Sequence, residues 1–385
     1  MGPAQPGNTV GTETDSFAAV ETPVEFAMLT GWQDANLAPA LEAFKRSCSR
    51  ILDRALDASI SERAPYAGTA LEWRPACESA NIATDSASAR AVFEAMLVPV
   101  EIRQTDGDSR FTGYFEPTIA ARRIPEFPYT QPVPGLPSDY VQVDPSVFGR
   151  PAGRKVPAQR QSDGSLRPYP PRSEIAQRGD NALGYAHPAD VFFLQIQGSG
   201  RLEFADGSSI RAAYAAHNAQ PFGSVANYLM NTGKIGRGEA TMQGIRAWMD
   251  RVSRAEAQAA MNQNPRFVFF RSLPIGDSNL GPEGAALVPL TPLGSMAIDP
   301  TFHPFGVPFF VQTNSPGLGG EWAGLLVAQD TGGAIKGKVR GDIYFGTGSE
   351  AGAAAGRQNA PGKMWALLPR PVAKRLLASP TTPSS

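Results

Sequence analysis

The stretch 325–348, LLVAQDTGGAIKGKVRGDIYFGTG, combines two short apolar runs with two carboxylates and a glycine-rich turn. The first apolar run ends at Asp330, and the second begins directly after Asp342. The glycines between them let the backbone turn tightly and leave it open to approach. A plain core hairpin needs neither acids nor a lysine at its turn. The stretch therefore predicts a functional groove beside this turn, with the rest of the chain built around it.

Short apolar segments separated by glycine and proline turns surround this stretch. Strands are predicted at 110–117, 189–197, 267–271, 286–290, 296–298, 307–313, 325–328, 343–345 and 364–368, with a hairpin turn at 206–207. Helices are predicted at 37–56, 88–97, 225–230, 239–250 and 255–262. The even spacing of the C-terminal strands is typical of a small closed or nearly closed barrel.

The composition sets limits on domain number and on ligands. A chain of 385 residues exceeds one typical core, which favours two domains. Its formal net charge of -1 argues against binding nucleic acid or a charged membrane surface. The two cysteines and three histidines lack the spacing of metal ligands, so no metal site is predicted. Cys48 and Cys77 could form a disulfide in an oxidising compartment or remain two buried thiols.

The first residues, MGPAQPGNTVGTETDS, contain neither a charged segment followed by an apolar core nor a lipid-attachment cysteine. No apolar run is long enough to span a bilayer. The sequence as it stands shows no export signal, which predicts either a cytoplasmic protein or one whose signal is not included.

Three aspartates lie at predicted strand edges, namely Asp299, Asp330 and Asp342. A barrel would bring such strand ends together, and an acid/base group with supporting carboxylates is one interpretation. The alternative is three turn aspartates that accept backbone hydrogen bonds. A proton donor needs a pKa raised by burial or by a neighbouring carboxylate. The apolar flank of Asp342 suits that role better than the glycine turn beside Asp330.

Other candidate motifs are weaker. The run GGAIKG lacks the spacing of a phosphate-binding loop. His217 has no nucleophile elbow nearby, so a catalytic triad is unsupported and a structural histidine is expected. The ring of Tyr114 could stack on a sugar, whereas Phe115 could equally belong to the core.

Several longer motifs resemble the membrane-bound lytic murein transglycosylase A family, in the order of that family from about residue 100 to 369. They are FTGYFEP (111–117), FLQIQGSGRL (193–202), PRFVFF (265–270), GSMAID (294–299), VAQDTGGAIKG (327–337) and GDIYFG (341–346). The last part also resembles the three-aspartate barrel domain. Residues 1–99 match the family poorly.

The resemblance implies a mainly β fold with flanking helices. Both chain ends would form a double-psi β-barrel domain, and a second β-domain would be inserted in the middle, with a glycan groove between the two. The expected division is a disordered lead-in at 1–30, the barrel domain with N-terminal helices at 31–116 and 265–372, the inserted β-rich domain at 117–264, and a tail at 373–385.

The resemblance also implies cleavage of the β-1,4 bond between N-acetylmuramic acid and N-acetylglucosamine without water. The C6 hydroxyl of the muramic acid attacks and leaves a 1,6-anhydro ring, so one acid suffices. By motif position Asp342 matches the catalytic aspartate, while Asp330 and Asp299 match the supporting ones. The expected sugar contacts are Thr112, Gly113, Tyr114, Gln197, Gly198, Ser199 and Lys336.

No cofactor is implied by the resemblance. The partners of the protein would be peptidoglycan glycan strands, together with candidate cell-wall synthesis or division proteins. The protein would act as a monomer in the periplasm or at the outer membrane. Two alternatives stay open: a hydrolase that uses Asp342 and a second carboxylate through water, and a non-catalytic glycan-binding barrel. Whether Lys336 touches substrate or pairs with an aspartate is also open.

Overall fold

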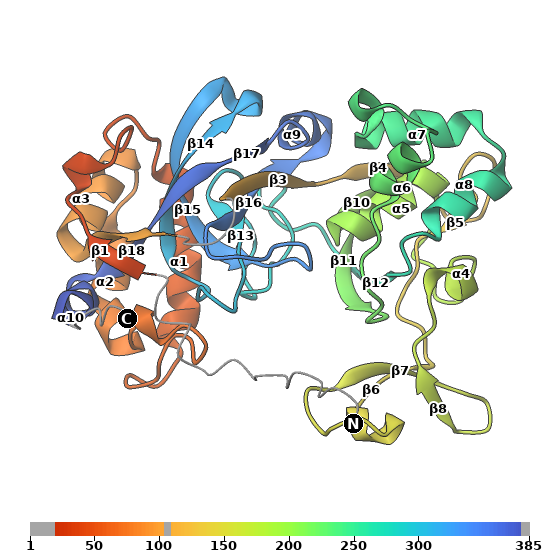
Figure 1. Ribbon diagram of the computed structural model, residues 1–385, viewed down its shortest axis with the longest axis horizontal. Helices are drawn as coiled ribbons and strands as arrows, with labels where there is room; N and C mark the ends of the chain where they lie inside the picture. Colours follow the sequence, from red (N-terminus) through yellow and green to blue (C-terminus); the bar gives the residue numbers. More distant parts are fainter. Residues whose placement is uncertain (1–19, 104–108, 379–385) are drawn as a thin grey trace, which may run out of the picture. The chain divides into compact units, whose positions relative to one another are not determined.

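The computed structural model describes residues 20–103 and 109–378, which form two compact units (Figure 1). The first unit contains the described residues of Met1–Thr112, Gly284–Ile343 and Asn359–Ser385. The second unit contains Gly113–Glu283 and Tyr344–Gln358. Each unit is discontinuous in sequence, so its core forms only when distant segments of the chain meet.

A nine-stranded sheet carries the first unit, in the order β1-β2-β18-β14-β15-β13-β16-β3-β17. Its strands are β1 (Val20–Pro23), β2 (Leu97–Ile102), β3 (Arg110–Glu116), β13 (Ser295–Ala297), β14 (Pro308–Ser315), β15 (Gly320–Asp330), β16 (Arg340–Thr347), β17 (Asn359–Ala360) and β18 (Gly362–Pro369). The pairing of β2 with β18 joins the two ends of the chain in one sheet. β13 runs parallel to β15 and antiparallel to β16, so it lies between the two strands that carry Asp330 and Asp342.

The α-helices of this unit, among its described residues, are α1 (Ala38–Leu52), α2 (Ala70–Ile82), α3 (Ser86–Met96) and α10 (Arg370–Ala378). In α1, Leu41, Phe44, Cys48 and Ile51 are buried at helical spacing, as the sequence predicts. α2 was not predicted, although Thr69 and Glu72 form a capping box at its start. Pro75 lies inside this helix, although proline is unfavourable in a helix interior.

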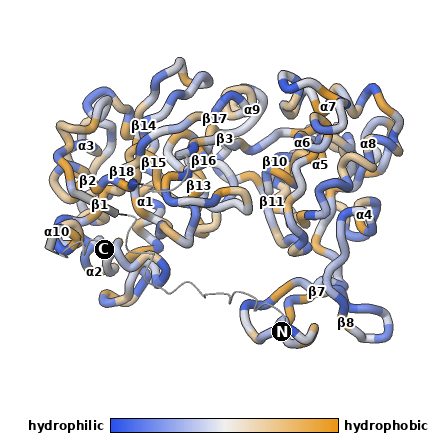
Figure 2. Tube along the Cα trace, in the orientation of Figure 1, coloured by the Kyte–Doolittle hydropathy of each residue, from blue (hydrophilic) through white to orange (hydrophobic). Residues whose placement is uncertain are grey.

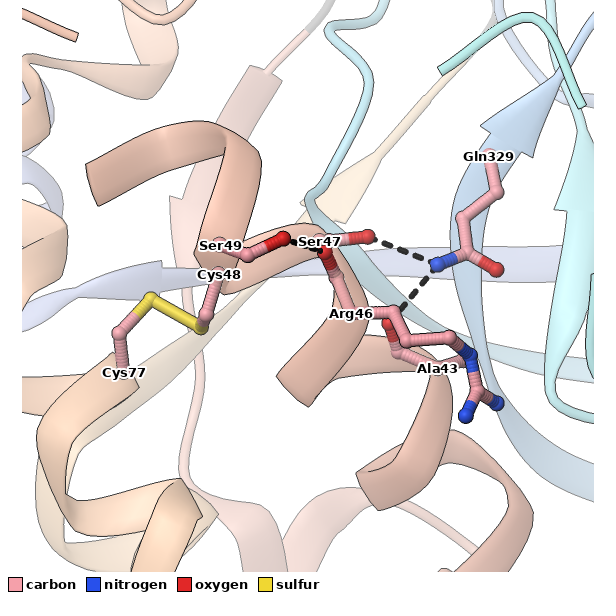
Figure 3. Close-up of a disulfide and its surroundings, with 7 residues drawn as sticks. All are labelled: Ala43, Arg46, Ser47, Cys48, Ser49, Cys77 and Gln329. Atoms are coloured by element: carbon pink, nitrogen blue, oxygen red, sulfur yellow. Dashed lines mark hydrogen bonds between the residues drawn. A yellow bond between two sulfur atoms is a disulfide. The ribbon is translucent and has the colours of Figure 1, made fainter. Parts of the chain in front are cut away.

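Cys48 of α1 and Cys77 of α2 form a disulfide with their Cα atoms 5.4 Å apart (Figure 3). The alternative of two free thiols is therefore wrong. One turn along, α1 also meets β15, because the amide nitrogen of Gln329 donates to the carbonyl of Ala43 at 2.7 Å and to Ser47 Oγ at 2.8 Å (Figure 3). These contacts fix the residue that precedes Asp330.

The second unit contains a six-stranded sheet in the order β12-β11-β10-β4-β9-β5 and a three-stranded sheet in the order β6-β7-β8. The strands are β4 (Thr118–Arg122), β5 (Gln131–Pro132), β6 (Tyr140–Val143), β7 (Val156–Arg160), β8 (Leu166–Pro168), β9 (Tyr185–Ala186), β10 (Gly200–Phe204), β11 (Ser209–His217) and β12 (Val268–Leu273). The helices are α4 (Arg172–Ile175), α5 (Pro188–Gln197), α6 (Val225–Asn231), α7 (Met242–Arg251), α8 (Arg254–Met261) and α9 (Gly348–Ala355). Figure 2 shows a mainly hydrophilic hairpin around β8, whereas buried apolar residues of α5 to α8 form a core of their own.

The segment 189–197, predicted as a buried strand, is helix α5 instead. Pro188 occupies the first turn, and the side chain of His187 accepts a hydrogen bond from the Ala189 N–H at 3.3 Å. Gly198 ends the helix with a φ of +85°. Most residues of α5 are buried, so the helix is apolar on nearly all sides and shows no period in sequence.

Sheets with flanking helices are confirmed, but helices and strands take nearly equal shares of the chain, so the helical content exceeds the prediction. No strand forms at 286–290, where Leu287 adopts a φ of +59° and the Gly284 N–H bonds the Val288 carbonyl. The double-psi topology stays a prediction. Within the described residues, no helix has the length and apolar character needed to cross a membrane.

Replacing both cysteines with alanine should lower the free energy of unfolding by about 3–4 kcal/mol, because the disulfide closes a loop between residues 29 apart. Urea unfolding of the double variant and of the oxidised protein measures the difference. Reduced wild-type protein is the matched control and should resemble the variant. Equal stability of the oxidised and reduced forms would contradict a supporting role for the bond.

Candidate active site

Asp342 lies on β16, between β13 and β3. It stands opposite Ala297 of β13. The preceding Gly341 is required by packing, because a Cβ there would lie 2.4 Å from the sulfur of Met296 and 2.9 Å from the ring of Phe111. The close approach of the three strands surrounds the carboxyl of Asp342 with protein atoms, although the residue keeps part of its surface exposed.

The hydroxyl of Thr112 on β3 donates a hydrogen bond to Asp342 Oδ1 at 2.5 Å. Thr112 was predicted as a sugar contact, and it contacts the predicted catalytic acid directly. Burial raises the pKa of Asp342 to about 6, while the Thr112 hydrogen bond and the positive charge of Arg340 act in the opposite direction. The negative charge of Asp330 adds to the upward shift. A carboxyl with this pKa can hold a proton at mildly acidic pH and release it readily.

Arg340 was not singled out in the sequence. Its guanidinium donates to Thr112 Oγ1 at 2.8 Å, to the Arg110 carbonyl at 3.3 Å and to the Gly341 carbonyl. Because side chains two residues apart share one face of a strand, the pattern Arg-Gly-Asp could have indicated that Arg340 and Asp342 lie together.

Asp330, at the end of β15, is anchored by backbone contacts. Its Oδ1 accepts a hydrogen bond from the Ala285 N–H at 3.0 Å, and its main-chain carbonyl accepts one from Ile298 at 2.9 Å. Asp330 also acts electrostatically on Asp342. These contacts suit the supporting role predicted for it.

Asp299 holds the glycine turn rather than the reacting carboxyl. It is buried, and its two oxygens accept hydrogen bonds from the backbone N–H groups of Thr301 and Gly337, each at 3.1 Å. Burial alone would raise the pKa of Asp299, but these hydrogen bonds and the nearby Lys336 hold it below its ordinary value. The Lys336 nitrogen lies 3.6 Å from Asp299 Oδ1, while 64% of its side chain is exposed. Lys336 thus pairs with an aspartate.

A buried histidine fixes the chain just before β16. His303 Nε2 lies 2.6 Å from the Lys338 carbonyl, and Nδ1 lies 2.9 Å from the hydroxyl of Tyr66. Burial lowers the pKa of His303 to about 4, so the ring is neutral at neutral pH. Its one N–H must donate to the carbonyl, and Nδ1 then accepts from Tyr66. No local pattern around His303 predicts this contact.

In the second unit, two of the predicted sugar contacts lie on β3. Gly113 is explained by packing, because a Cβ there would lie 2.6 Å from the ring of Phe345 and 2.9 Å from the backbone of Ala355. The ring of Tyr114 lies 5.2 Å from that of Tyr344, centre to centre. Tyr114 therefore belongs to an aromatic pair.

The other predicted contacts follow α5. Gln197 Oε1 accepts a hydrogen bond from the Phe115 N–H at 3.4 Å, which brings the end of α5 to β3. Gly198 supplies the left-handed turn that ends the helix, and Ser199 is buried. The motif position of Gln197 does not predict its hydrogen bond with Phe115.

Glu116 is a buried acid that the sequence analysis left without a role. Its carboxylate pairs with Arg201 at 2.9 Å and with Arg211 at 2.6 Å, and it accepts a hydrogen bond from Thr347 at 2.9 Å. These donors come from β10, β11 and β16, so the cluster joins three strands to β3. Such a paired buried charge fixes geometry, because removing one partner leaves the others uncompensated.

The part of the chain that the structure describes contains no group of three or more His, Cys, Asp or Glu residues able to hold a metal ion.

Two family models match the chain. Residues 110–271 match the MltA specific insert domain, and residues 294–368 match the 3D domain. The chain is also 33% identical over 271 residues to membrane-bound lytic murein transglycosylase A of Escherichia coli K12, covering 69% of this chain and 67% of that protein.

Solved structures are similar over nearly the whole chain. MltA from Neisseria gonorrhoeae aligns with a TM-score of 0.78 and 30% identity, covering 95% of this chain and 96% of that one. MltA from Escherichia coli with bound chitohexaose aligns with a TM-score of 0.65 and 26% identity, covering 91% and 94%.

Replacing Asp299 with asparagine should lower the free energy of unfolding by about 1.5–3 kcal/mol at neutral pH, because charge-assisted hydrogen bonds are lost. The pKa of Asp299 is lowered in the folded protein, so its contribution is present above its ordinary value of 3.8 and is lost as the pH falls through the folded pKa. Urea unfolding of both proteins across that range tests this. Lys336→Met, which removes only an exposed partner, should cost about 1 kcal/mol or less. A difference in the free energy of unfolding between Asp299→Asn and wild type that does not change with pH would contradict a stabilising role for the Asp299 carboxylate.

Proposed function

The chain belongs to the membrane-bound lytic murein transglycosylase A family, and on that premise we propose that it cleaves glycan strands with Asp342 as the single acid/base. It is a peptidoglycan lytic transglycosylase, a lyase-type enzyme that acts without water. The bond cleaved is the β-1,4 bond between N-acetylmuramic acid and N-acetylglucosamine. The observation that carries the assignment to Asp342 is its buried carboxyl with a raised pKa, held by Thr112.

The reaction needs one group that gives a proton and then takes one. Protonated Asp342 donates its proton to the glycosidic oxygen as the bond from that oxygen to C1 of the muramic acid breaks. The C6 hydroxyl of the same sugar then bonds to C1 and closes the 1,6-anhydro ring. Its proton passes to the Asp342 carboxylate, which restores the starting acid. No water is consumed, and no second catalytic carboxylate is required.

Asp330 and Asp299 take supporting roles in this proposal. Asp330 keeps a negative charge near Asp342, which favours the protonated acid. Asp299 closes the glycine turn through Gly337. The contact of Lys336 with Asp299 supports a role in holding that turn, and its exposed side chain leaves it able to reach substrate.

The proposed sugar contacts are Thr112, Gly113, Tyr114, Gln197, Gly198 and Ser199. Glycan oligomers as ligands are supported by the similar Escherichia coli structure, which holds chitohexaose. Stacking on an aromatic ring is the usual way a protein binds a pyranose face, and Tyr114 offers such a ring. The groove predicted from the resemblance stays a prediction.

For the architecture we propose the double-psi barrel with the division given by the resemblance: 31–116 with 265–372 as barrel domain and 117–264 as insert. The family matches at 110–271 and 294–368 support an insert followed by the C-terminal part of a barrel. The pairing of β2 with β18 supports a domain built from both chain ends.

A periplasmic location at the outer membrane is proposed from the membrane-bound relatives. The disulfide between Cys48 and Cys77 supports an oxidising compartment. A monomeric state and contacts with cell-wall synthesis or division proteins stay predictions.

Asp342→Asn should lower turnover of isolated peptidoglycan by at least about 100-fold, because the amide cannot donate or accept the proton. Mass spectrometry of the soluble products should show 1,6-anhydromuramyl ends from the native protein. Asp57→Asn, which changes an exposed aspartate of the same unit, is the matched control and should retain activity.

The same digestion in water enriched in oxygen-18 separates the alternatives. The proposal requires no heavy oxygen at the new ends. Reducing ends that carry oxygen-18 would instead identify a hydrolase with a second carboxylate. Binding to peptidoglycan with no soluble product would identify a non-catalytic glycan-binding barrel.

A further inference from the structure

The hydroxyl of Thr112 lies between a cation and the catalytic carboxyl. Arg340 Nη2 is 2.8 Å from Thr112 Oγ1, and that oxygen is 2.5 Å from Asp342 Oδ1. A guanidinium can only donate hydrogen bonds, whereas a hydroxyl has one proton to donate and lone pairs that accept. Arg340 occupies one of the two lone pairs of the Thr112 oxygen, and the Thr112 proton points at Asp342 Oδ1. Arg340 therefore favours the arrangement in which Thr112 donates to the carboxyl.

This direction distinguishes the two carboxyl oxygens of Asp342. Oδ1 accepts the Thr112 proton, which favours Oδ2 as the oxygen that carries the proton of the carboxyl. Oδ2 is then the oxygen that protonates the glycosidic oxygen and later receives the proton of the C6 hydroxyl. A freely rotating hydroxyl at Thr112 could instead accept from the carboxyl and turn the reactive proton away from substrate.

The positive charge of Arg340 also interacts electrostatically with the carboxyl of Asp342. Its hydrogen bonds go to neutral oxygens, namely the hydroxyl of Thr112 and the carbonyls of Arg110 and Gly341. The guanidinium is partly buried, so water screens it incompletely. Its positive charge favours the ionised form of Asp342.

The other charged groups around Asp342 come from neighbouring strands. Asp330 on β15 opposes Arg340 by favouring the protonated carboxyl. On β3, the charge of Arg110 acts on Arg340, and its side chain bonds Asn359 at 2.8 Å. β13, with the sequence Ser-Met-Ala, contributes no charged side chain. Arg340 is thus the cation that is linked to Asp342 by hydrogen bonds through Thr112.

We propose that Arg340 is a positioning residue for the transglycosylase reaction: through Thr112 it fixes which oxygen of Asp342 carries the proton, and its charge stabilises the carboxylate that takes the C6 hydroxyl proton. The proposal rests on the function proposed above for Asp342.

The test is the pH dependence of kcat/KM for release of anhydromuramyl products from isolated peptidoglycan. The wild-type profile should fall as the pH rises through about 6, because the acid must be protonated. Arg340→Gln removes the charge that favours the carboxylate, so the fall should move upward by about one pH unit. The low-pH plateau should drop about tenfold, because the hydroxyl is no longer oriented.

Arg340→Lys loses the forked donor but keeps the positive charge. Because the charge is kept, the activity of this variant should fall at the same pH as that of the wild type. Arg110→Gln is the matched control, since it removes a neighbouring cation whose side chain does not touch Thr112. The control profile should match the wild type.

Thr112→Val tests the route of the effect. Because Thr112 transmits the orientation, the plateau of Arg340→Gln combined with Thr112→Val should equal that of Thr112→Val alone. Losses that multiply in the double variant would overturn the route through Thr112.

A profile of Arg340→Gln that coincides with that of Arg110→Gln would overturn the proposal. If Arg340→Gln does not fold, as judged by circular dichroism, Thr112→Val and Arg340→Lys test the proposal. The fall must then move upward in Thr112→Val and stay in place in Arg340→Lys, and the reverse result would contradict the inference. Loss of anhydro products from the wild type would instead refute the proposed function.

Discussion

The hydrogen bond between Thr112 and Asp342 joins two strands whose residues are 230 positions apart in the chain. Burial raises the pKa of Asp342 to about 6, and this bond limits how far it rises. Both effects require β3 and β16 to lie side by side. The chain can place them together only if its N-terminal part returns to meet its C-terminal part. The discontinuous first unit is therefore a condition for the chemistry.

Buried polar contacts fix the segments on either side of this acid. His303 binds the Lys338 carbonyl just before β16, and Asp299 closes the glycine turn through Gly337. Gln329 ties the end of β15 to α1 next to the disulfide. In the second unit, Glu116 joins the far part of β3 to three other strands. Fully satisfied networks of this kind specify one arrangement of the backbone.

The sequence predicted the parts of this arrangement that have local signals. The apolar run before Asp330 and the acid beside small residues at Asp342 identified their strands, and the helical spacing identified α1. The buried helix α5 was mistaken for a strand, because a helix buried on nearly all sides has no period. Glu116 was missed because its partners come from other strands, and the role of Arg340 was missed because its link to Asp342 runs through Thr112 of β3. Only tertiary structure brings those partners together.

Catalysis by a single carboxyl requires that Asp342 has a raised pKa and serves as both acid and base. The most direct measurement is a carbon-13 NMR titration of the aspartate carboxyls, with the Asp342 signal assigned by its absence in Asp342→Asn. This signal should titrate at about 6. Titration at the ordinary value of 3.8 would contradict it.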